Sequence, residues 1–299
     1  MNSPEIVPPP IRLVTRLLAE MQTNVIEAGL RAMGGNLDQF TIYTLIVRQS
    51  LGGGGAISAH SLAHSLARPY ETVRRHIGAL IARGLCYRAP NGIAASPEAL
   101  DAGPISEAVV AAHDGFVRFV EDLAMLGIPL PQPRSGIPYS TRVAVQAAAD
   151  MLLAVMDSNR GTHHDWTELV LFSTVMCANA RNYARDPVLA RRHADERTPP
   201  PESIRLPVRP SVAARVIGVS ESTARRRFEA MVGDGRLIRT QRGLLVSEDW
   251  MNQPAQVETS RSSYYNIKRI LERVAAAGFP FGAPASVYLR GRPADTRFA

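Results

Sequence analysis

Apolar residues recur every three to four positions along several stretches of the chain, which is the period of an amphipathic α-helix. One such stretch covers residues 12–33 and another covers 142–156. Asp38 and Asp165 each open a further helical pattern, and acidic residues are typical of the first turn of a helix. Together these patterns predict a mainly helical protein.

A more compact pattern lies between these long helices. Residues 62–66 predict a short helix, and a turn follows at 67–69. A second helix is marked by an apolar stripe of four residues, Val73, Ile77, Leu80 and Ile81. Gly84 is expected to end that helix, and residues 85–95 predict a small β-hairpin. Two helices joined by a tight turn and followed by a hairpin are typical of a winged helix-turn-helix.

The same pattern returns 151 residues later. Residues 57–76 align without a gap with residues 208–227, and Gly127 aligns with Gly278. So long an ungapped match predicts an internal duplication. We therefore predict two homologous modules, 10–133 and 139–284, followed by a polar tail, 285–299, that is expected to fray. The predicted helix-turn-helix and wing cover about 58–83 and 85–95 in the first module, and about 209–234 and 236–246 in the second.

Each predicted module has a long amphipathic helix in front of its helix-turn-helix and another behind it. The trailing stripe runs from Phe116 to Leu126 in the first module and from Ile267 to Ala277 in the second. A small winged domain does not need both helices to close its own core, so their spare apolar faces should pack against the other copy. The predicted fold is therefore mainly α with small β-hairpin wings, in which two tandem modules form a pseudo-dimer.

The distribution of charge suggests the kind of partner. The chain has a formal net charge of +7 and a pI near 9.9. Residues up to Arg134 carry 11 basic and 11 acidic side chains, so the whole positive excess lies in the rest of the chain. Such a balance favours an anionic partner, and nucleic acid is the first candidate.

A helical wheel of each second helix identifies side chains that would face DNA. Arg75 points almost directly away from the apolar stripe. An arginine can bond guanine through two N–H groups or clamp a phosphate, and a threonine near the helix start can bond a phosphate beside free backbone amides. The candidate DNA-binding residues on the two helices and the second wing tip are Thr72, Arg74, Arg75, His76, Ser222, Thr223, Arg225, Arg226, Arg227 and Arg242.

The alternative for these residues is an ordinary solvated helix face. The pattern Thr-x-Arg-Arg stands at the same place in both copies although surrounding residues differ, which favours DNA contact. Arg88 and Arg239 also repeat, on the wing strand, where contact with DNA and bracing of the hairpin both remain open.

The order of elements resembles that of the MarR-like winged-helix regulators of bacteria. The resemblance covers most of both modules and includes Thr72-Val73-Arg74-Arg75 with Gly84-Leu85, although GntR-type and IclR-type regulators share these signals. It implies that leading and trailing helices form a dimer interface and that two recognition helices bind one DNA site. Because both copies stand in one chain, the target implied is an asymmetric pair of half-sites, with recognition helices ~34 Å apart.

Other chemistry-bearing residues carry weaker signals. Gly52–Gly55 lacks the Gly-Lys-Ser/Thr of a phosphate-binding loop, and His60 and His64 have metal-ligand spacing without an evident third ligand. Trp166 and Tyr183 would line an effector pocket between the modules or simply pack in the core. No catalytic motif is present, so we expect no enzyme, no cofactor and no metal.

We expect a cytoplasmic bacterial transcription regulator that binds double-stranded DNA sequence-specifically through both winged helices. The second module should dominate affinity because it carries the positive excess. Two alternatives are a plasmid or phage replication initiator with tandem winged-helix domains and a winged-helix adaptor that binds protein instead of DNA. A small-molecule effector and pairing of two chains both remain open, and no membrane partner is expected.

Overall fold

The computed structural model describes residues 8–134 and 136–298. The first half contains α1 (Ile11–Ala32), α2 (Leu37–Leu51), α3 (Ala59–Leu66), α4 (Tyr70–Ala82), β1 (Cys86–Ala89), β2 (Gly92–Ala95), α5 (Pro97–Asp101) and α6 (Gly103–Met125). The second half contains α7 (Thr141–Ser158), α8 (Trp166–Arg185), α9 (Pro187–Arg192), η1 (Glu202–Ile204), α10 (Pro210–Ile217), α11 (Glu221–Gly233), β3 (Leu237–Thr240), β4 (Gly243–Val246), α12 (Glu248–Met251), α13 (Pro254–Ala276) and η2 (Pro284–Val287). The predicted mainly helical fold with two small antiparallel hairpins is confirmed.

Side-chain caps explain where several helices begin. The Gln39 N–H donates to Asn36 Oδ1 at 2.9 Å at the start of α2. The Glu168 N–H donates to Asp165 Oδ1 at 2.9 Å at the start of α8. Each bond satisfies one of the backbone donors that a helix N-terminus leaves without an internal partner. The helix predicted to open near Asp165 therefore starts directly after that residue.

Equivalent elements in the two halves have bounds that differ by the same 151 residues. This holds for the pairs α3 and α10, α4 and α11, β1 and β3, β2 and β4, and α6 and α13. We call residues 57–95 the first helix–hairpin unit and residues 208–246 the second helix–hairpin unit. In both units a left-handed residue, Ala67 or Gly218, turns the chain between the two helices.

A matching glycine holds each hairpin against the strand residue that precedes the unit's first helix. Gly92 and Gly243 both have φ 141°, a conformation that L side chains rarely adopt. A Cβ at Gly92 would lie 2.3 Å from the Ile57 carbonyl oxygen, and one at Gly243 would lie 2.4 Å from that of Val208. The close approach lets Ile57 pair with Ile93, and Val208 with Leu244, through backbone hydrogen bonds.

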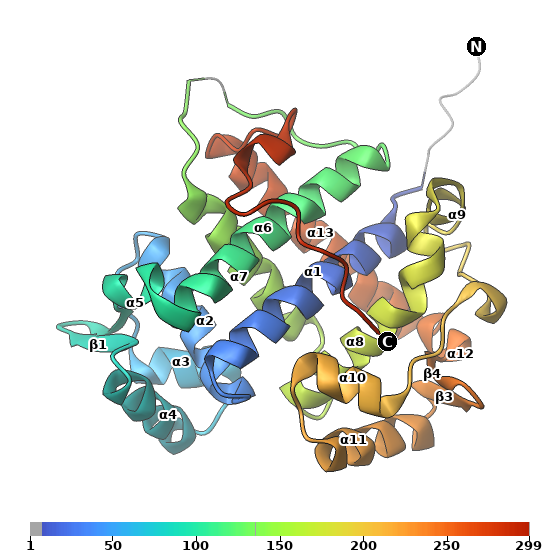
Figure 1. Ribbon diagram of the computed structural model, residues 1–299, viewed down its shortest axis with the longest axis horizontal. Helices are drawn as coiled ribbons and strands as arrows, with labels where there is room; N and C mark the ends of the chain where they lie inside the picture. Colours follow the sequence, from blue (N-terminus) through green and yellow to red (C-terminus); the bar gives the residue numbers. More distant parts are fainter. Residues whose placement is uncertain (1–7, 135, 299) are drawn as a thin grey trace.

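Four long helices, α1, α6, α7 and α13, form the centre of the molecule, and the two helix–hairpin units lie on either side of it (Figure 1). Helix α1 packs on α6 and α13, while α7 packs on α13 and α6. Helix α8 packs on α1, and α2 packs on α7, so each leading helix supports the second helix of the other half. The buried residues Phe116, Phe119, Ile267 and Ile270 belong to this centre. Their burial removes from water the apolar faces of α6 and α13, which the sequence analysis described as spare.

Residues 286–298 of the tail are held against the helices, contrary to the expectation that the tail frays. The backbone N–H groups of Leu289 and Arg290 each donate to the buried Asp114 carboxylate at 2.9 Å. Arg118 Nη1 donates to the Ala294 carbonyl at 3.0 Å, and Thr296 is only 7% exposed. The polar tail packs there because its backbone and side chains add hydrogen-bond partners to buried charged groups of α1 and α6.

No helix in the described part of the chain combines the length and the apolar character needed to cross a bilayer.

Candidate nucleic-acid interface

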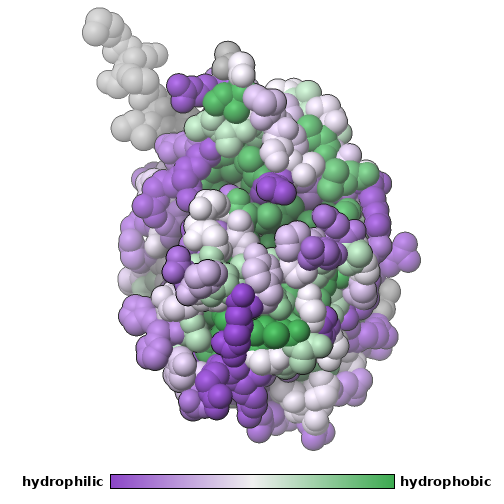
Figure 2. Space-filling model, turned by 90° about the vertical axis from the view of Figure 1, so that its left-hand side faces the viewer, coloured by the Kyte–Doolittle hydropathy of each residue, from purple (hydrophilic) through white to green (hydrophobic). Residues whose placement is uncertain are grey.

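Helices α4 and α11 both lie at the lower edge of the molecule in Figure 1, with the two hairpins toward the outer flanks. Seen from the side that carries β1, hydrophilic residues gather at the lower end, the level at which α4 lies, and apolar residues lie nearer the middle (Figure 2). The apolar sides of both helices face their own units. Their buried apolar residues are Val73, Ile77 and Leu80 in α4, and Ala224, Phe228 and Met231 in α11. The opposite sides are left open to solvent.

The first helix–hairpin unit presents Arg74 and Arg75, both exposed, on the open side of α4. Arg74 is not free, because its Nη2 lies 2.8 Å from Glu71 Oε2. The pair is solvent-exposed, with 64% and 70% of the two side chains accessible, so it is easily opened. Thr72 is half-buried in the first turn of α4, where the N-cap residue Pro69 provides no side-chain cap.

The second helix–hairpin unit presents Arg225 and Arg226 at the matching positions, and both are exposed. Neither has an ion pair within the described residues. Ser222 is exposed, while Thr223 is half-buried and accepts a hydrogen bond from the Ser220 hydroxyl at 2.9 Å. The wing tip adds exposed Arg242.

The second unit is the more basic of the two. Arg209, Arg215 and Arg242 are exposed in it, and the positions 151 residues earlier hold Ser58, His64 and Asn91. Arg88 and Arg239, at equivalent positions on the wing strands, are exposed in both units. The second unit therefore carries more exposed arginines than the first.

His76 and Arg227, equivalent residues that were both predicted to face DNA, do not lie on the open side. His76 is only 9% exposed, and burial lowers its pKa. Arg227 is partly buried, and its Nη2 donates to Asp165 Oδ2 at the start of α8. The reason is helical geometry, since a residue three positions after Val73 lies only about 60° from it around the helix. Both side chains therefore lie beside the buried stripe and away from the open side, and Arg227 contacts the start of α8. DNA contact by these two residues stays a prediction that their burial does not favour.

A cluster of buried charged residues lies just after the end of α11 and was not predicted from the sequence. Arg236 is 5% exposed and its Nε donates to Asp234 Oδ1 at 2.9 Å, while its Nη1 donates to Glu168 and, at 3.0 Å, to His163 Nδ1. Burial, together with the charge of Arg236, lowers the pKa of His163 to about 4. One feature of the sequence could have indicated this cluster, because Arg236 occupies the position equivalent to Leu85 of the first unit. A charged side chain that is buried at the start of a strand requires buried partners of opposite charge or hydrogen-bonding groups.

Other candidate residues do not form a second site together. Trp166 and Tyr183 line different cavities, so they do not share one effector pocket. His60 and His64 are exposed, and no group of three or more His, Cys, Asp or Glu capable of holding a metal occurs among the described residues. Cys86 and Cys177 are buried free thiols, and burial raises the pKa of Cys86 to about 12.

Comparisons with models of protein families, with curated proteins and with solved structures show no match for this chain.

Proposed function

We propose that the protein is a transcription regulator that binds double-stranded DNA sequence-specifically through two winged helix-turn-helix units of one chain. The observation that carries the proposal is the pair α4 and α11, each of which leaves an arginine-bearing side open at the same edge of the molecule. Each is the second helix of a helix–turn–helix followed by a hairpin, the arrangement in which the second helix enters the major groove.

The equivalent elements are best explained as products of an internal duplication that gave a pseudo-dimer. The constant shift of 151 residues and the reciprocal packing of leading helices on the opposite half support this origin. The central helices would then hold the two reading helices at one fixed separation, as the dimer interface does in MarR-like regulators. The expected separation corresponds to one turn of DNA, ~34 Å.

In the proposed complex, phosphate contacts supply most of the affinity and base contacts supply the choice of sequence. Arg75 and Arg226 occupy the most outward positions and carry the proposed base contacts. Thr72 lies near the uncapped start of α4, where a hydroxyl and free amides suit a phosphate. Thr223 lies at the matching place in α11, where its N–H already donates to Ser220 Oγ and its hydroxyl would contact the phosphate. Arg242 would reach the minor groove or the backbone beside the wing. Because the two open sides differ in sequence, the half-sites should differ as well.

Selection of duplexes from a random pool tests the proposal. The purified protein should enrich a consensus of two unlike half-sites centred about 10 base pairs apart. The double variant R75A/R226A should lose the enrichment, whereas Arg142→Ala, which removes an exposed arginine at the start of α7, should keep it. A pool that remains random with the unaltered protein would refute sequence-specific DNA binding.

A further inference from the structure

An exposed pair of aromatic rings distinguishes the first helix–hairpin unit from the second. The ring centroids of His60 on α3 and Tyr70 on α4 lie 4.5 Å apart, with the ring planes at 40° to each other. Both residues are exposed, and 39% of the Tyr70 surface is accessible to solvent. Every other ring contact among the described residues involves at least one residue that is buried or half-buried. The pair is therefore a surface feature and not a part of the core.

The unit does not need this pair in order to fold. The positions 151 residues later hold Ser211 and Glu221, and the helices and strands of the second unit have the same lengths. Glu221 is the first residue of α11, where a carboxylate stabilises the positive end of the helix. Tyr70 begins α4 without that benefit and leaves apolar ring surface in water. A role in binding therefore explains the pair better than a role in folding.

The pair joins the first turns of the two helices of the helix-turn-helix. His60 is the second residue of α3, and Tyr70 is the first residue of α4. Arg74 follows Tyr70 by four residues, which places both side chains on the same side of α4. In a helix-turn-helix bound to DNA, the N-terminal residues of the second helix contact base edges in the major groove. Tyr70 thus occupies the part of α4 that would meet the bases, beside one of the exposed arginines.

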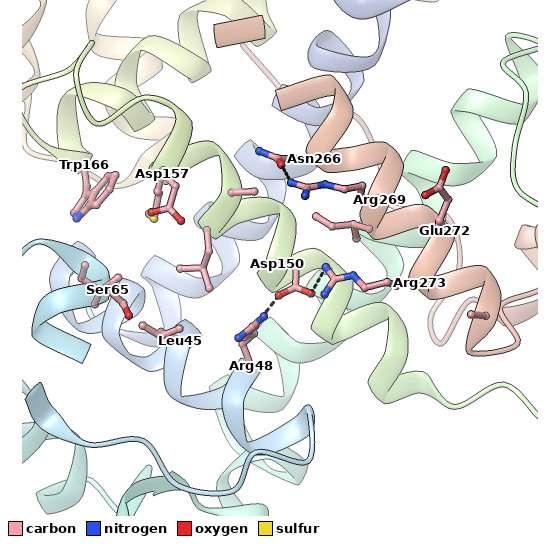
Figure 3. A pocket seen from close by; sticks show the side chains of 16 residues that line it. Leu45, Arg48, Ser65, Asp150, Asp157, Trp166, Asn266, Arg269, Glu272 and Arg273 are labelled. Carbon is pink, nitrogen blue, oxygen red and sulfur yellow. Dashed lines mark hydrogen bonds and ion pairs between the residues drawn. The ribbon is translucent and has the colours of Figure 1, made fainter. Parts of the chain in front are cut away.

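Helix α3 is fixed at its opposite end, where it meets the second half of the molecule. Ser65 lines the cavity beside Asp150, at which α2 and α3 of the first half meet α7, α8 and α13 of the second (Figure 3). The Arg160 guanidinium group, just after α7, donates to the Ser65 carbonyl oxygen. Because α3 is anchored in this way, His60 forms a firm support for the Tyr70 ring, which then loses little conformational freedom on binding.

We infer that Tyr70 contacts the 5-methyl group of a thymine in the half-site of the first unit, and that His60 holds the ring in place. Thymine is the only one of the four bases that presents an apolar group in the major groove, and an apolar side chain is its matching contact. The pair supplies an aromatic surface there, whereas Glu221 in the second unit supplies a carboxylate. Only the first half-site should therefore require a thymine at this place. The inference rests on the proposed function and names the base that one of its reading helices selects.

Uracil replacement in the duplex selected from the random pool tests the inference. Each thymine is replaced in turn by uracil, which lacks only the 5-methyl group, and gel-shift titration measures the affinity. One replacement in the half-site that depends on Arg75 should weaken binding roughly fourfold, the usual effect of losing one buried methyl group. This methyl effect should vanish in Tyr70→Ala and persist in Tyr70→Phe, which keeps the ring.

Three further variants separate the roles of the residues. Tyr265→Ala removes an exposed tyrosine from α13, outside both helix–hairpin units, and should keep the methyl effect. Tyr70→Glu introduces the residue that the second unit has at this position, so it is compatible with the fold, and it should lose the methyl effect as Tyr70→Ala does. His60→Ser should reduce the methyl effect because the Tyr70 ring loses its support. An unchanged methyl effect in His60→Ser would overturn the positioning role of His60.

The outcomes distinguish this inference from the proposed function. If the protein selects two half-sites but no uracil replacement weakens binding, the inference is overturned while sequence-specific binding stands. The same holds if the methyl effect survives in Tyr70→Ala, because another residue then makes the contact. Melting curves that match the unaltered protein show that a lost effect in the variants is not due to misfolding. A pool that remains random would refute the proposed function and this inference with it.

Discussion

The two helix–hairpin units have the same order and length of helices and strands but differ in charge. Both keep a glycine with the same φ at the hairpin and a left-handed residue between the helices. The first unit rests on apolar contacts around Leu85, whereas the second has Arg236 in a buried ion cluster at the same position. Positions that fix the backbone are thus common to both units, while the side chains that anchor them or face solvent differ.

The largest expected effect on stability comes from Arg236, whose buried ion cluster has no counterpart in the first unit. Arg236→Ala would leave Glu168 buried without its cationic partner, and breaking a buried pair in this way costs about 3–5 kcal/mol of the free energy of unfolding. Urea denaturation measures the loss. The double variant R236L/E168L restores the apolar character of the first unit and should recover much of it. A loss below about 1 kcal/mol in R236A would mean that the cluster is not an anchor.

The next largest loss of stability should be equal in the two units and concerns the glycine of each hairpin. Gly92→Ala and Gly243→Ala each place a Cβ against a carbonyl oxygen at positive φ, so each should cost about 2 kcal/mol or more. Gly78→Ala, at an exposed position inside α4 with open space around its Cβ, is the control and should not destabilise the protein. Clearly unequal losses at Gly92 and Gly243 would contradict a shared backbone.

Part of the pH dependence of stability should come from His163, which contacts Arg236 of the second unit. The pKa of His163 falls from its usual 6.5 to about 4 in the folded protein, mainly because burial disfavours the charged imidazole. Between these pH values the unfolded chain binds a proton that the folded protein does not, so stability falls as the pH drops from about 6.5 to about 4. Denaturation of His163→Gln should show a smaller fall over this window, and an unchanged fall would assign it to other groups.

DNA affinity should also depend more on the second unit. Arg226→Ala should weaken binding to the selected duplex roughly tenfold or more, as expected for a lost arginine–guanine contact, and Arg75→Ala should weaken it less. The reason is the larger number of arginines around α11, since Arg209, Arg215 and Arg242 have uncharged counterparts in the first unit. Gel-shift titrations at one salt concentration compare the variants, and equal losses would contradict the asymmetry.

The smallest effect concerns the exposed pair on α4. Glu71→Gln frees Arg74 from its carboxylate partner and removes a negative charge near the proposed phosphate contacts. Affinity for the selected duplex should rise roughly twofold, as is typical of weak surface pairs. A decrease in the same gel-shift assay would indicate that Glu71 itself contacts DNA.

Much of the fold could be predicted because the local pattern of apolar residues and glycines determines where the helices lie and end. The stripe around Val73 and the glycine after it are enough to place α4 and its end, and the shift of 151 residues carries that reading to α11. The outward arginines Arg75 and Arg226 follow from the same periodicity. The proposed DNA-binding side was thus accessible from sequence in outline.

Features that depend on long-range packing could not be predicted. A helical-wheel projection of α4 or α11 alone places His76 and Arg227 on the outer side. In the structure α2 covers this side of α4, and α8 covers this side of α11. The tail looks disordered by composition, yet its partner Asp114 lies more than 170 residues away in sequence. The cavity beside Asp150 exists only because α2 of one half meets α7 and α13 of the other.

The spacing of the half-sites tests most directly the claim that one chain places two reading helices on one duplex. In the selected duplex, insertion of about 5 base pairs, half a turn, would move the second half-site to the opposite face of the DNA. The account predicts that affinity then falls to that of a duplex with a single half-site. Unchanged affinity after the insertion would contradict simultaneous binding by α4 and α11.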